Sequence, residues 1–317
     1  MSFELFNESL INENKNLFDS LKKTNLHAHA LLSSNQKNFM NEFHRPMKNC
    51  EVLSNYQNFD KCIKDNLSEL IANKESQLKL YELSILTAID DGVSVFDISV
   101  DYKSVYRIFD GSICNYINEM KKLKDKYKNK IILNYDLGIN REGYMKEHNY
   151  LIKKLIESKI FNGIDLIGDE LSKSLNNFKK IYKIAKNNNL VLKAHIGEYG
   201  DAKSIKKAIK ILKLNEIQHG ISIVNNEKIM KYAKKKNIIF NVCISSNLVL
   251  LNNININNHP IRKMYDYGLK VTINTDDELI FNSSLFSEYL LLYKNEIFNS
   301  KELYEILNNG LKLYNLN

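Results

Sequence analysis

Four short segments of the chain end in side chains that can bind a divalent metal ion. They lie far apart in the sequence and are Asn25-Leu-His-Ala-His29, Ala194-His-Ile-Gly-Glu198, Ile217-Gln-His-Gly220 and Val271-Thr-Ile-Asn-Thr-Asp-Asp277. Each is an apolar or β-prone run that closes in imidazole or carboxylate groups, which bind zinc and orient a water molecule beside it. We interpret the four segments as one metal site built from the ends of strands.

The first and last segments each carry a pair of candidate ligands. On a strand, a spacing of two residues turns His27 and His29 to the same face, which in a barrel can be the interior. Two buried imidazoles without partners would be costly, which favours a shared metal ion. Surface or core histidines are the alternative. Asp276 and Asp277 are adjacent, and their carboxylates would repel each other unless a cation lay beside them.

The two middle segments add groups that can move protons. His195 supplies a third imidazole, and Glu198 follows three residues later, where a carboxyl group could act on a substrate without touching the metal. The alternative is that Glu198 favours a helix N-terminus. A metal ion with three histidines and one carboxylate needs no further imidazole. His219 is therefore better interpreted as a residue that orients the water, with a core histidine as the alternative.

The elements that must position these groups alternate between short apolar strands and longer amphipathic helices. Period and punctuation predict eight strands, over residues 25–30, 93–100, 130–138, 163–168, 190–195, 216–222, 238–244 and 269–274. An apolar stripe over 171–184, for example, predicts a helix between two of them. This alternation predicts an α/β fold of the (β/α)8 TIM barrel type, in which the polar strand ends form one ring around one mouth. A doubly wound sheet is the alternative.

Length and composition predict one large domain. The chain has 317 residues, of which 44% are hydrophobic and 26% charged, so it can bury a large core. No repeat or flexible linker divides it, and we expect a single domain over 1–317. The segment 31–90 exceeds an ordinary connection and contains helical stretches such as 68–90. We interpret it as a helical cap over the barrel mouth, with helices packed on the barrel's flank as the alternative.

Composition also limits the classes of partner. The formal net charge of +8 invites a nucleic-acid interpretation, but the lysines stand singly or in short runs on helical segments, where solvated faces normally carry them. No apolar stretch approaches the roughly 20 residues of a membrane span, and no signal peptide or metal-type cysteine spacing is present. We expect a cytoplasmic protein without nucleic-acid or membrane partners, and its oligomeric state stays open.

Taken in order, the four segments resemble the motifs of the adenosine deaminase family of zinc-dependent (β/α)8-barrel aminohydrolases. The resemblance extends to Gly163-Ile-Asp-Leu-Ile-Gly-Asp-Glu170, to Val242-Cys-Ile-Ser-Ser-Asn247 and to His259-Pro260, and so covers nearly the whole chain. It implies one zinc ion per chain, with the four ligands His27, His29, His195 and Asp276.

The resemblance also implies how the remaining residues act on a purine nucleoside. Glu198 matches the family's proton donor, His219 the histidine that positions the attacking hydroxide, and Asp277 the aspartate that binds substrate and accepts the water's proton. Gly168 matches a glycine whose backbone contacts the purine, and His29 is expected to bind substrate as well as zinc. The implied reaction, a step of purine salvage, is hydrolytic deamination of adenosine or 2′-deoxyadenosine to inosine or 2′-deoxyinosine, with release of ammonia.

One departure from the family's pattern bears on the substrate. The family usually follows its His-x-His motif with Leu-Asp-Gly, and that aspartate contacts the ribose 5′ hydroxyl, whereas this chain has Leu31 there. A leucine cannot accept that hydrogen bond, and a buried hydroxyl without a partner costs about 1 to 3 kcal/mol. Two alternatives therefore stay open: another 6-aminopurine, such as adenine or an N6-modified or phosphorylated adenosine derivative, and a barrel that binds a nucleoside without turnover.

Overall fold

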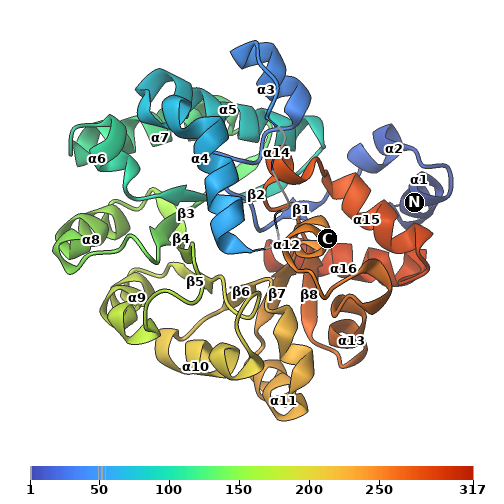
Figure 1. The fold of residues 1–317 in the computed structure, drawn as a ribbon. Helices are drawn as coiled ribbons and strands as arrows, with labels where there is room; N and C mark the ends of the chain where they lie inside the picture. The colour runs from blue at the N-terminus through green and yellow to red at the C-terminus, as the bar shows by residue number, and fades with distance from the viewer. Residues whose placement is uncertain (1, 49, 51–52, 54, 317) are drawn as a thin grey trace.

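The computed structural model describes residues 2–48, 50, 53 and 55–316. Within this part of the chain, eight parallel strands lie at the centre and helices surround them, which confirms the predicted (β/α)8 barrel (Figure 1). The strands are β1 (Thr24–Asn25), β2 (Val95–Asp101), β3 (Ile132–Asn140), β4 (Phe161–Ile167), β5 (Val191–Ala194), β6 (Glu216–Gln218), β7 (Ile239–Val242) and β8 (Lys270–Ile273).

Two seams close the barrel. Continuous hydrogen bonding forms a five-stranded sheet in the order β1-β2-β3-β4-β5 and a three-stranded sheet in the order β6-β7-β8. Isolated bridges join the two sheets: His195, just after β5, pairs with Gln218 at the end of β6, and Ala28, after β1, pairs with Asp276, after β8. Both seams therefore lie among the predicted metal-binding residues.

The first strand is shorter than the sequence predicts. β1 ends at Asn25 and not at residue 30, because the backbone N–H of Leu26 donates to the side-chain Oδ1 of Asn274 instead of continuing the ladder. His27 and His29 thus lie in the connection that follows the strand.

Helices connect the strands and cover the outside of the barrel (Figure 1). They are α1 (Ser2–Ile11), α2 (Lys15–Asp19), α3 (Gln36–Phe43), α4 (Tyr56–Ala72), α5 (Lys74–Asp90), α6 (Ser104–Ile108), α7 (Ile113–Tyr127), α8 (Asn149–Glu157), α9 (Lys179–Asn187), α10 (Ala202–Leu212), α11 (Glu227–Lys235), α12 (Ile244–Leu250), α13 (Ile261–Asp266), α14 (Glu278–Phe281), α15 (Leu285–Lys294) and α16 (Ser300–Leu313), with 3-10 turns η1 (Lys146–His148), η2 (Leu175–Asn177), η3 (Ile221–Asn225) and η4 (Ile256–Asn258). No helix in the described ranges combines the length and the apolar character that crossing a bilayer requires.

The single helix predicted over 171–184 is wrong at its beginning. The chain forms η2 first, and α9 starts only at Lys179. Leu171 is 70% exposed, whereas Phe178 and Ile181 are buried. An apolar residue at helical spacing therefore marked a turn rather than a core-facing helix.

Three helices, α3, α4 and α5, fill the long connection between β1 and β2. Asparagine side chains start the two longer ones: Asn55 accepts a hydrogen bond from the N–H of Asn58 before α4, and Asn73 caps α5 in the same way. In Figure 1, α4 runs across the centre of the view, over the strands. A disulfide between Cys50 and Cys62 joins α4 to the segment that precedes it.

A charged layer lies in the barrel interior. Nζ of the fully buried Lys193 lies 2.6 Å from Oδ2 of Asp97, 2.8 Å from Oδ2 of Asp136 and 3.6 Å from Oε2 of Glu216. The hydroxyl group of Tyr314, just after α16, donates to Asp97 at 2.9 Å. Residues 193 and 195 point to the same face of a strand, so this layer lies directly behind the His195 position.

Candidate active site

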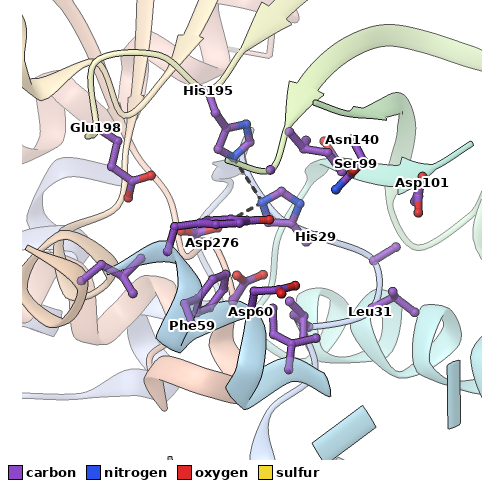
Figure 2. Close-up of a pocket in the computed structure, with 18 of the residues that line it drawn as sticks. His29, Leu31, Phe59, Asp60, Ser99, Asp101, Asn140, His195, Glu198 and Asp276 are labelled. Atoms are coloured by element: carbon purple, nitrogen blue, oxygen red, sulfur yellow. Dashed lines mark hydrogen bonds and ion pairs between the residues drawn. The ribbon is translucent and has the colours of Figure 1, made fainter. Parts of the chain in front are cut away.

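Three histidines and one aspartate converge at one end of the barrel. Nε2 of His195 lies 3.0 Å from Nε2 of His27 and 3.2 Å from Nε2 of His29. Oδ1 of Asp276 lies 3.5 Å from Nε2 of His27 and 3.3 Å from Nε2 of His29. Figure 2 shows His29, His195 and Asp276 grouped at the centre of the pocket. The structure therefore brings together the four residues that the sequence predicts as metal ligands.

This set of donors fits one zinc ion. Ligand atoms that would share an ion at about 2.0 to 2.1 Å each lie roughly 3 to 4 Å from one another. The separations given above, 3.0 to 3.5 Å, have this size. Burial also lowers the pKa of His27 well below its usual value, which keeps the ring in the neutral form that binds metals.

A buried carboxylate orients His195. Oδ1 of Asp165, on β4, lies 3.3 Å from Nδ1 of His195, and its Oδ2 accepts a 2.7 Å hydrogen bond from the hydroxyl of Ser99. Although burial acts against the charged form, the neighbouring His195 ring holds the pKa of Asp165 below its usual range. A carboxylate on the far side of a histidine fixes its ring and strengthens it as a ligand.

Glu198 and His219 lie beside this cluster. Nε2 of His219 is 3.7 Å from Oε1 of Glu198 and 3.7 Å from Oδ2 of Asp276. Asn247, on α12, contacts both residues, because its Nδ2 lies 3.1 Å from Nδ1 of His219 and 3.5 Å from Oε1 of Glu198. An amide N–H can only donate, so Nδ1 of His219 accepts and the ring proton lies on Nε2, toward Glu198 and Asp276.

Burial decides the protonation of these groups. It raises the pKa of Glu198 well above the usual value, and the charges of Asp276 and Glu170 raise it further, so this carboxyl group favours its protonated form. Burial lowers the pKa of His219 to about 3, which keeps the ring neutral. Burial and then the adjacent Asp276 raise the pKa of Asp277. Oδ1 of Asp277 is buried without a hydrogen-bond partner among the described residues, as expected of a group that binds a ligand.

Two of the site residues hold unusual backbone conformations. His219 has φ 61° and Asp276 has φ 59°, in the left-handed region that residues other than glycine seldom adopt. Such a conformation costs on the order of 1 to 3 kcal/mol and is found mostly at functional sites. Backbone hydrogen bonds hold both residues in this conformation. The N–H of His219 donates to the carbonyl oxygen of Asn241 at 2.9 Å, and the N–H of Asp276 donates to that of His27 at 3.1 Å.

The predicted site residues share one pocket, with a volume of about 200 Å³. Its lining includes His29, Gly168, His195, Glu198, His219, Asp276 and Asp277, and His27 lies against His195 next to it. Gly168 has φ 90°, and a Cβ atom there would come within 2.3 Å of Glu142 Oε2, so this turn requires glycine.

The other end of the pocket has a different lining. Leu31 and Asp101 lie there, and α4 contributes Tyr56, Phe59, Asp60 and Ile63. Figure 2 shows Glu198 on one side of His29 and His195, with Leu31 and Asp101 on the opposite side. A bound molecule thus meets the proton-carrying groups at one end and a mixed apolar and acidic surface at the other.

The structure places here several residues to which the sequence motifs assign no role. Asp165 and Asn247 are two of them, although both lie in segments that support the resemblance. The signal for Asp165 is a lone acid within an apolar strand two residues before its end, on the same face as the ligands. The pocket residues of α4 carried no recognisable signal, because their place depends on how α4 lies over the barrel.

Known proteins with similar sequences are purine deaminases. A relative from Treponema pallidum, whose provisional name is adenosine/adenine deaminase, is 32% identical over 238 residues, which cover 74% of this chain and 73% of the relative. The adenosine deaminase of Plasmodium gallinaceum is 31% identical over 268 residues, or 83% of this chain and 70% of the relative.

Solved structures share the fold. An amidohydrolase from Burkholderia ambifaria with bound zinc superimposes with a TM-score of 0.76 at 20% identity, covering 94% of this chain and 86% of that one. The N6-methyl-AMP deaminase of Arabidopsis thaliana gives a TM-score of 0.76 at 19% identity, covering 93% and 92%. At these identities the likeness concerns the barrel alone.

A match to the sequence profile of a protein family is decisive. The profile described as adenosine deaminase matches residues 138–316, more than half of the chain, and this range includes the site residues from Gly168 to Asp277. Together with the two similar sequences, this match shows that the chain belongs to the adenosine deaminase family and is a hydrolase acting on the carbon–nitrogen bond of a cyclic amidine.

Proposed function

We propose that this protein is a zinc-dependent aminohydrolase that converts adenosine or 2′-deoxyadenosine to inosine or 2′-deoxyinosine, with release of ammonia. One observation carries this proposal: Glu198, which favours its protonated form, and His219 lie in the same pocket as the cluster of three histidines and Asp276. Its family membership and its similarity to purine deaminases support the same reaction. We propose one zinc ion per chain, with the ligands His27, His29, His195 and Asp276.

The chain's own residues divide the proton transfers between them. Bound zinc would lower the pKa of a water molecule to about 7 and so supply a nucleophile at neutral pH. His219 orients the attacking oxygen through its Nε2–H, and Asp277 accepts the proton. Glu198 donates a proton to N1 of the purine as the ring loses its aromatic character. Asp277 then passes the proton it took to the amino group, and the C6–N bond breaks with release of ammonia. The remaining proton of the attacking oxygen returns to Glu198 as the C6 carbonyl forms. The backbone of Gly168 and the ring of His29 position the base.

The far end of the pocket favours an uncharged substituent on the purine. N9 and the N1–C6 edge lie at opposite ends of the base, so a purine bound at the proton donor directs its N9 substituent toward Leu31 and Asp101. The described lining includes Asp60 and Asp101 but no lysine or arginine, the side chains that bind phosphate. Lys64 and Arg107 are engaged in ion pairs with these two carboxylates. The acidic side chains in the described lining, without a lysine or arginine beside them in it, support a nucleoside over a nucleotide as the substrate.

Adenine and other 6-aminopurines without a phosphate are the second candidate. Leu31 lines the pocket and offers no hydrogen-bond acceptor to a ribose 5′ hydroxyl. A base without a sugar loses nothing by this. The name of the relative from Treponema pallidum joins both activities.

A panel of substrates with zinc measured in the same sample tests the proposal. We expect adenosine and 2′-deoxyadenosine to be deaminated faster than adenine, and AMP and N6-methyl-AMP to react slowest, with absorbance change and ammonia release as the readouts. We expect one zinc ion per chain. Turnover of the nucleotides but not of the nucleosides would contradict the proposed substrate, and full activity in metal-free protein would contradict the role of zinc.

We predict that Glu198→Gln retains zinc and lowers kcat by about a hundredfold or more, because an amide cannot donate the proton that N1 needs. In the wild type, the protonated form of Glu198 is the donor and its pKa is raised, so kcat should fall as pH rises through that pKa. This fall should be absent from the residual activity of the variant. Steady-state rates from pH 5 to 9 measure both effects, with the exposed Glu227→Gln as the control. Turnover near that of the wild type would remove Glu198 from the mechanism.

We further propose that the chain forms a single domain over 1–317, in which α3, α4 and α5 provide the cap expected over 31–90. The position of Tyr56, Phe59 and Ile63 in the pocket lining supports the cap. We also propose that the protein works in the cytoplasm. The exposed free thiol of Cys114 suits a reducing compartment.

A further inference from the structure

We propose that Glu170 is a positioning residue that holds Glu198 in place for proton transfer, by binding the backbone of the loop that carries it. This inference rests on the proposed role of Glu198. Glu170 lies in the turn after β4 and is 3% exposed. It does not line the pocket, so it acts through the loop formed by residues 197–200.

The Glu170 carboxylate accepts hydrogen bonds from four consecutive backbone N–H groups. Oε1 accepts from Gly197 at 2.6 Å, and Oε2 accepts from Glu198 at 3.1 Å, Tyr199 at 2.9 Å and Gly200 at 3.0 Å. The 197–200 loop lies between β5 and α10 and belongs to neither element. Buried N–H groups need acceptors, and here one side chain provides the acceptors that a strand or a helix would otherwise supply.

The glycines at both ends of the loop fit this arrangement. A Cβ atom at Gly200 would lie 2.2 Å from Oε1 of Glu170, so the backbone approaches the carboxylate at a distance that no side chain permits. Gly197 has φ 78°, a conformation that glycine adopts without strain. The backbone of the loop is therefore shaped around the Glu170 carboxylate.

The same turn is also anchored on its other side. The N–H of Asp169 donates to Oε2 of Glu142 at 2.9 Å, and Oε1 of Glu142 accepts from the hydroxyl of Tyr56, on α4, at 2.7 Å. Gly168, whose backbone we propose to contact the purine, comes directly before Asp169. Glu170 thus fixes Glu198 relative to the turn that would hold the base. Proton transfer depends on the distance between Glu198 and N1 of that base.

Two variants and one control test this role. Glu170→Gln keeps one acceptor oxygen but turns an N–H₂ group toward the loop's own N–H groups. Gly200→Ala displaces the carboxylate without removing its charge. Because a misplacement of about 1 Å can cost roughly a hundredfold in rate, we expect kcat to fall by about a hundredfold in the first variant and at least tenfold in the second. The KM for adenosine should stay within about threefold, and zinc content should not change.

Asp201→Asn is the matched control. Asp201 follows the loop directly, and its Oδ1 accepts from the N–H of Ser204 at 2.8 Å to cap α10. The change from acid to amide is the same as in Glu170→Gln, but Asp201 does not bind the loop's N–H groups in any contact of the described residues. We expect its kcat to stay within about twofold of the wild type.

Binding of two inhibitors separates positioning from general loosening of the fold. A purine ribonucleoside hydrated at C6 carries a hydrogen on N1 and so depends on Glu198, whereas 1-deazaadenosine lacks N1. In both Glu170→Gln and Gly200→Ala, which we call the loop variants, we expect the affinity for the hydrated analogue to fall in parallel with kcat. The affinity for 1-deazaadenosine should stay as in the wild type. Equal weakening of both inhibitors, or wild-type kcat in either loop variant, would overturn the positioning role. A wild-type protein that deaminates no 6-aminopurine would overturn the proposed function itself, and this inference with it.

Discussion

At the scale of single residues, two of the histidines that would do chemistry are each held by a second buried polar group. Asp165 contacts Nδ1 of His195, and the amide of Asn247 contacts Nδ1 of His219. Both partners are fully buried or nearly so, where a misaligned polar group is costly. The orientation of the ligand and of the water-orienting histidine therefore depends on residues that touch neither metal nor substrate.

Replacing Asp165 should weaken zinc binding. In Asp165→Asn the partner of His195 loses its charge, and loss of such a partner typically costs ten- to a hundredfold in metal affinity. Competition with a chromophoric chelator at fixed pH measures the change. Ser99→Ala is the control, because it removes the hydrogen bond to Oδ2 of Asp165 and leaves Oδ1 beside His195. Unchanged zinc affinity in Asp165→Asn would mean that the contact does not support the ligand.

A second prediction concerns Leu31, at the opposite end of the pocket. Leu31→Asp would give the ribose 5′ hydroxyl an acceptor, and one hydrogen bond to a charged group contributes about 1.5 to 3 kcal/mol. We expect the KM for adenosine to fall by about tenfold. The control is in the substrate: the KM for 5′-deoxyadenosine and for adenine should not fall. Equal changes for all three would show that the sugar lies elsewhere.

The sequence predicts the ligands well and their supports poorly, for a physical reason. His27, His29 and Asp276 stand out because imidazoles or paired carboxylates at strand ends are hard to explain without a metal ion. Asp165 and Asn247 are isolated polar residues with many possible partners, and the partner is known only once β4, β5 and α12 are placed around the barrel.

At the scale of elements, a buried carboxylate also joins α15 to the start of α12. Oε2 of Glu288, on α15, accepts from the N–H of Ile244 at 2.7 Å and of Ser245 at 3.0 Å. Oε1 of Glu288 has no partner within the described residues. Burial raises the pKa of Glu288 to about 7.

This raised pKa predicts how stability depends on pH. A carboxyl group whose pKa is higher in the folded than in the unfolded protein favours folding at low pH, and this contribution is lost as pH rises through about 7. Glu288→Gln resembles the protonated form and should remove the dependence. The free energy of unfolding of the wild type, relative to the variant, should therefore fall by on the order of 2 to 3 kcal/mol between pH 4.5 and 8. Urea unfolding at several pH values measures it, and a constant difference would contradict the prediction.

The ends of strands and helices can be predicted from the sequence only where hydrogen bonds between backbone groups set them. The centres of seven of the eight predicted strands lie within about two residues of those observed, because buried parallel strands have continuous apolar sequences. β1 ends early because the Asn274 side chain takes the N–H of Leu26, a contact across 248 residues that no local pattern contains. Leu171 fits a helical period, yet it lies in an exposed turn.

At the scale of the whole molecule, the barrel closes around the buried charge of Lys193. Its three carboxylate neighbours come from β2, β3 and β6, so this one side chain connects both sheets. The apolar pattern of the strands does not predict such a layer, because the charges compensate one another only after the barrel has formed.

Removing Lys193 should destabilise the fold. Lys193→Met leaves buried carboxylates without their cation, and breaking a buried ion pair in this way costs about 3 to 5 kcal/mol. Urea unfolding of the variant measures the loss, with the exposed Lys203→Met on α10 as the control. A loss of less than about 1 kcal/mol would show that the carboxylates take up protons at little cost.

The seam between the first and the last strand of the barrel gives the metal site a structural role as well. Asp276 follows the last strand and His27 and His29 follow the first, and a single bridge joins these two ends of the sheet. An ion bound by these residues would hold the ends of the first and the last strand together. Removing it with a chelator would then open the architecture as well as stop the reaction. Loss of activity after such treatment would not by itself identify a catalytic metal, and the state of the seam has to be measured alongside it.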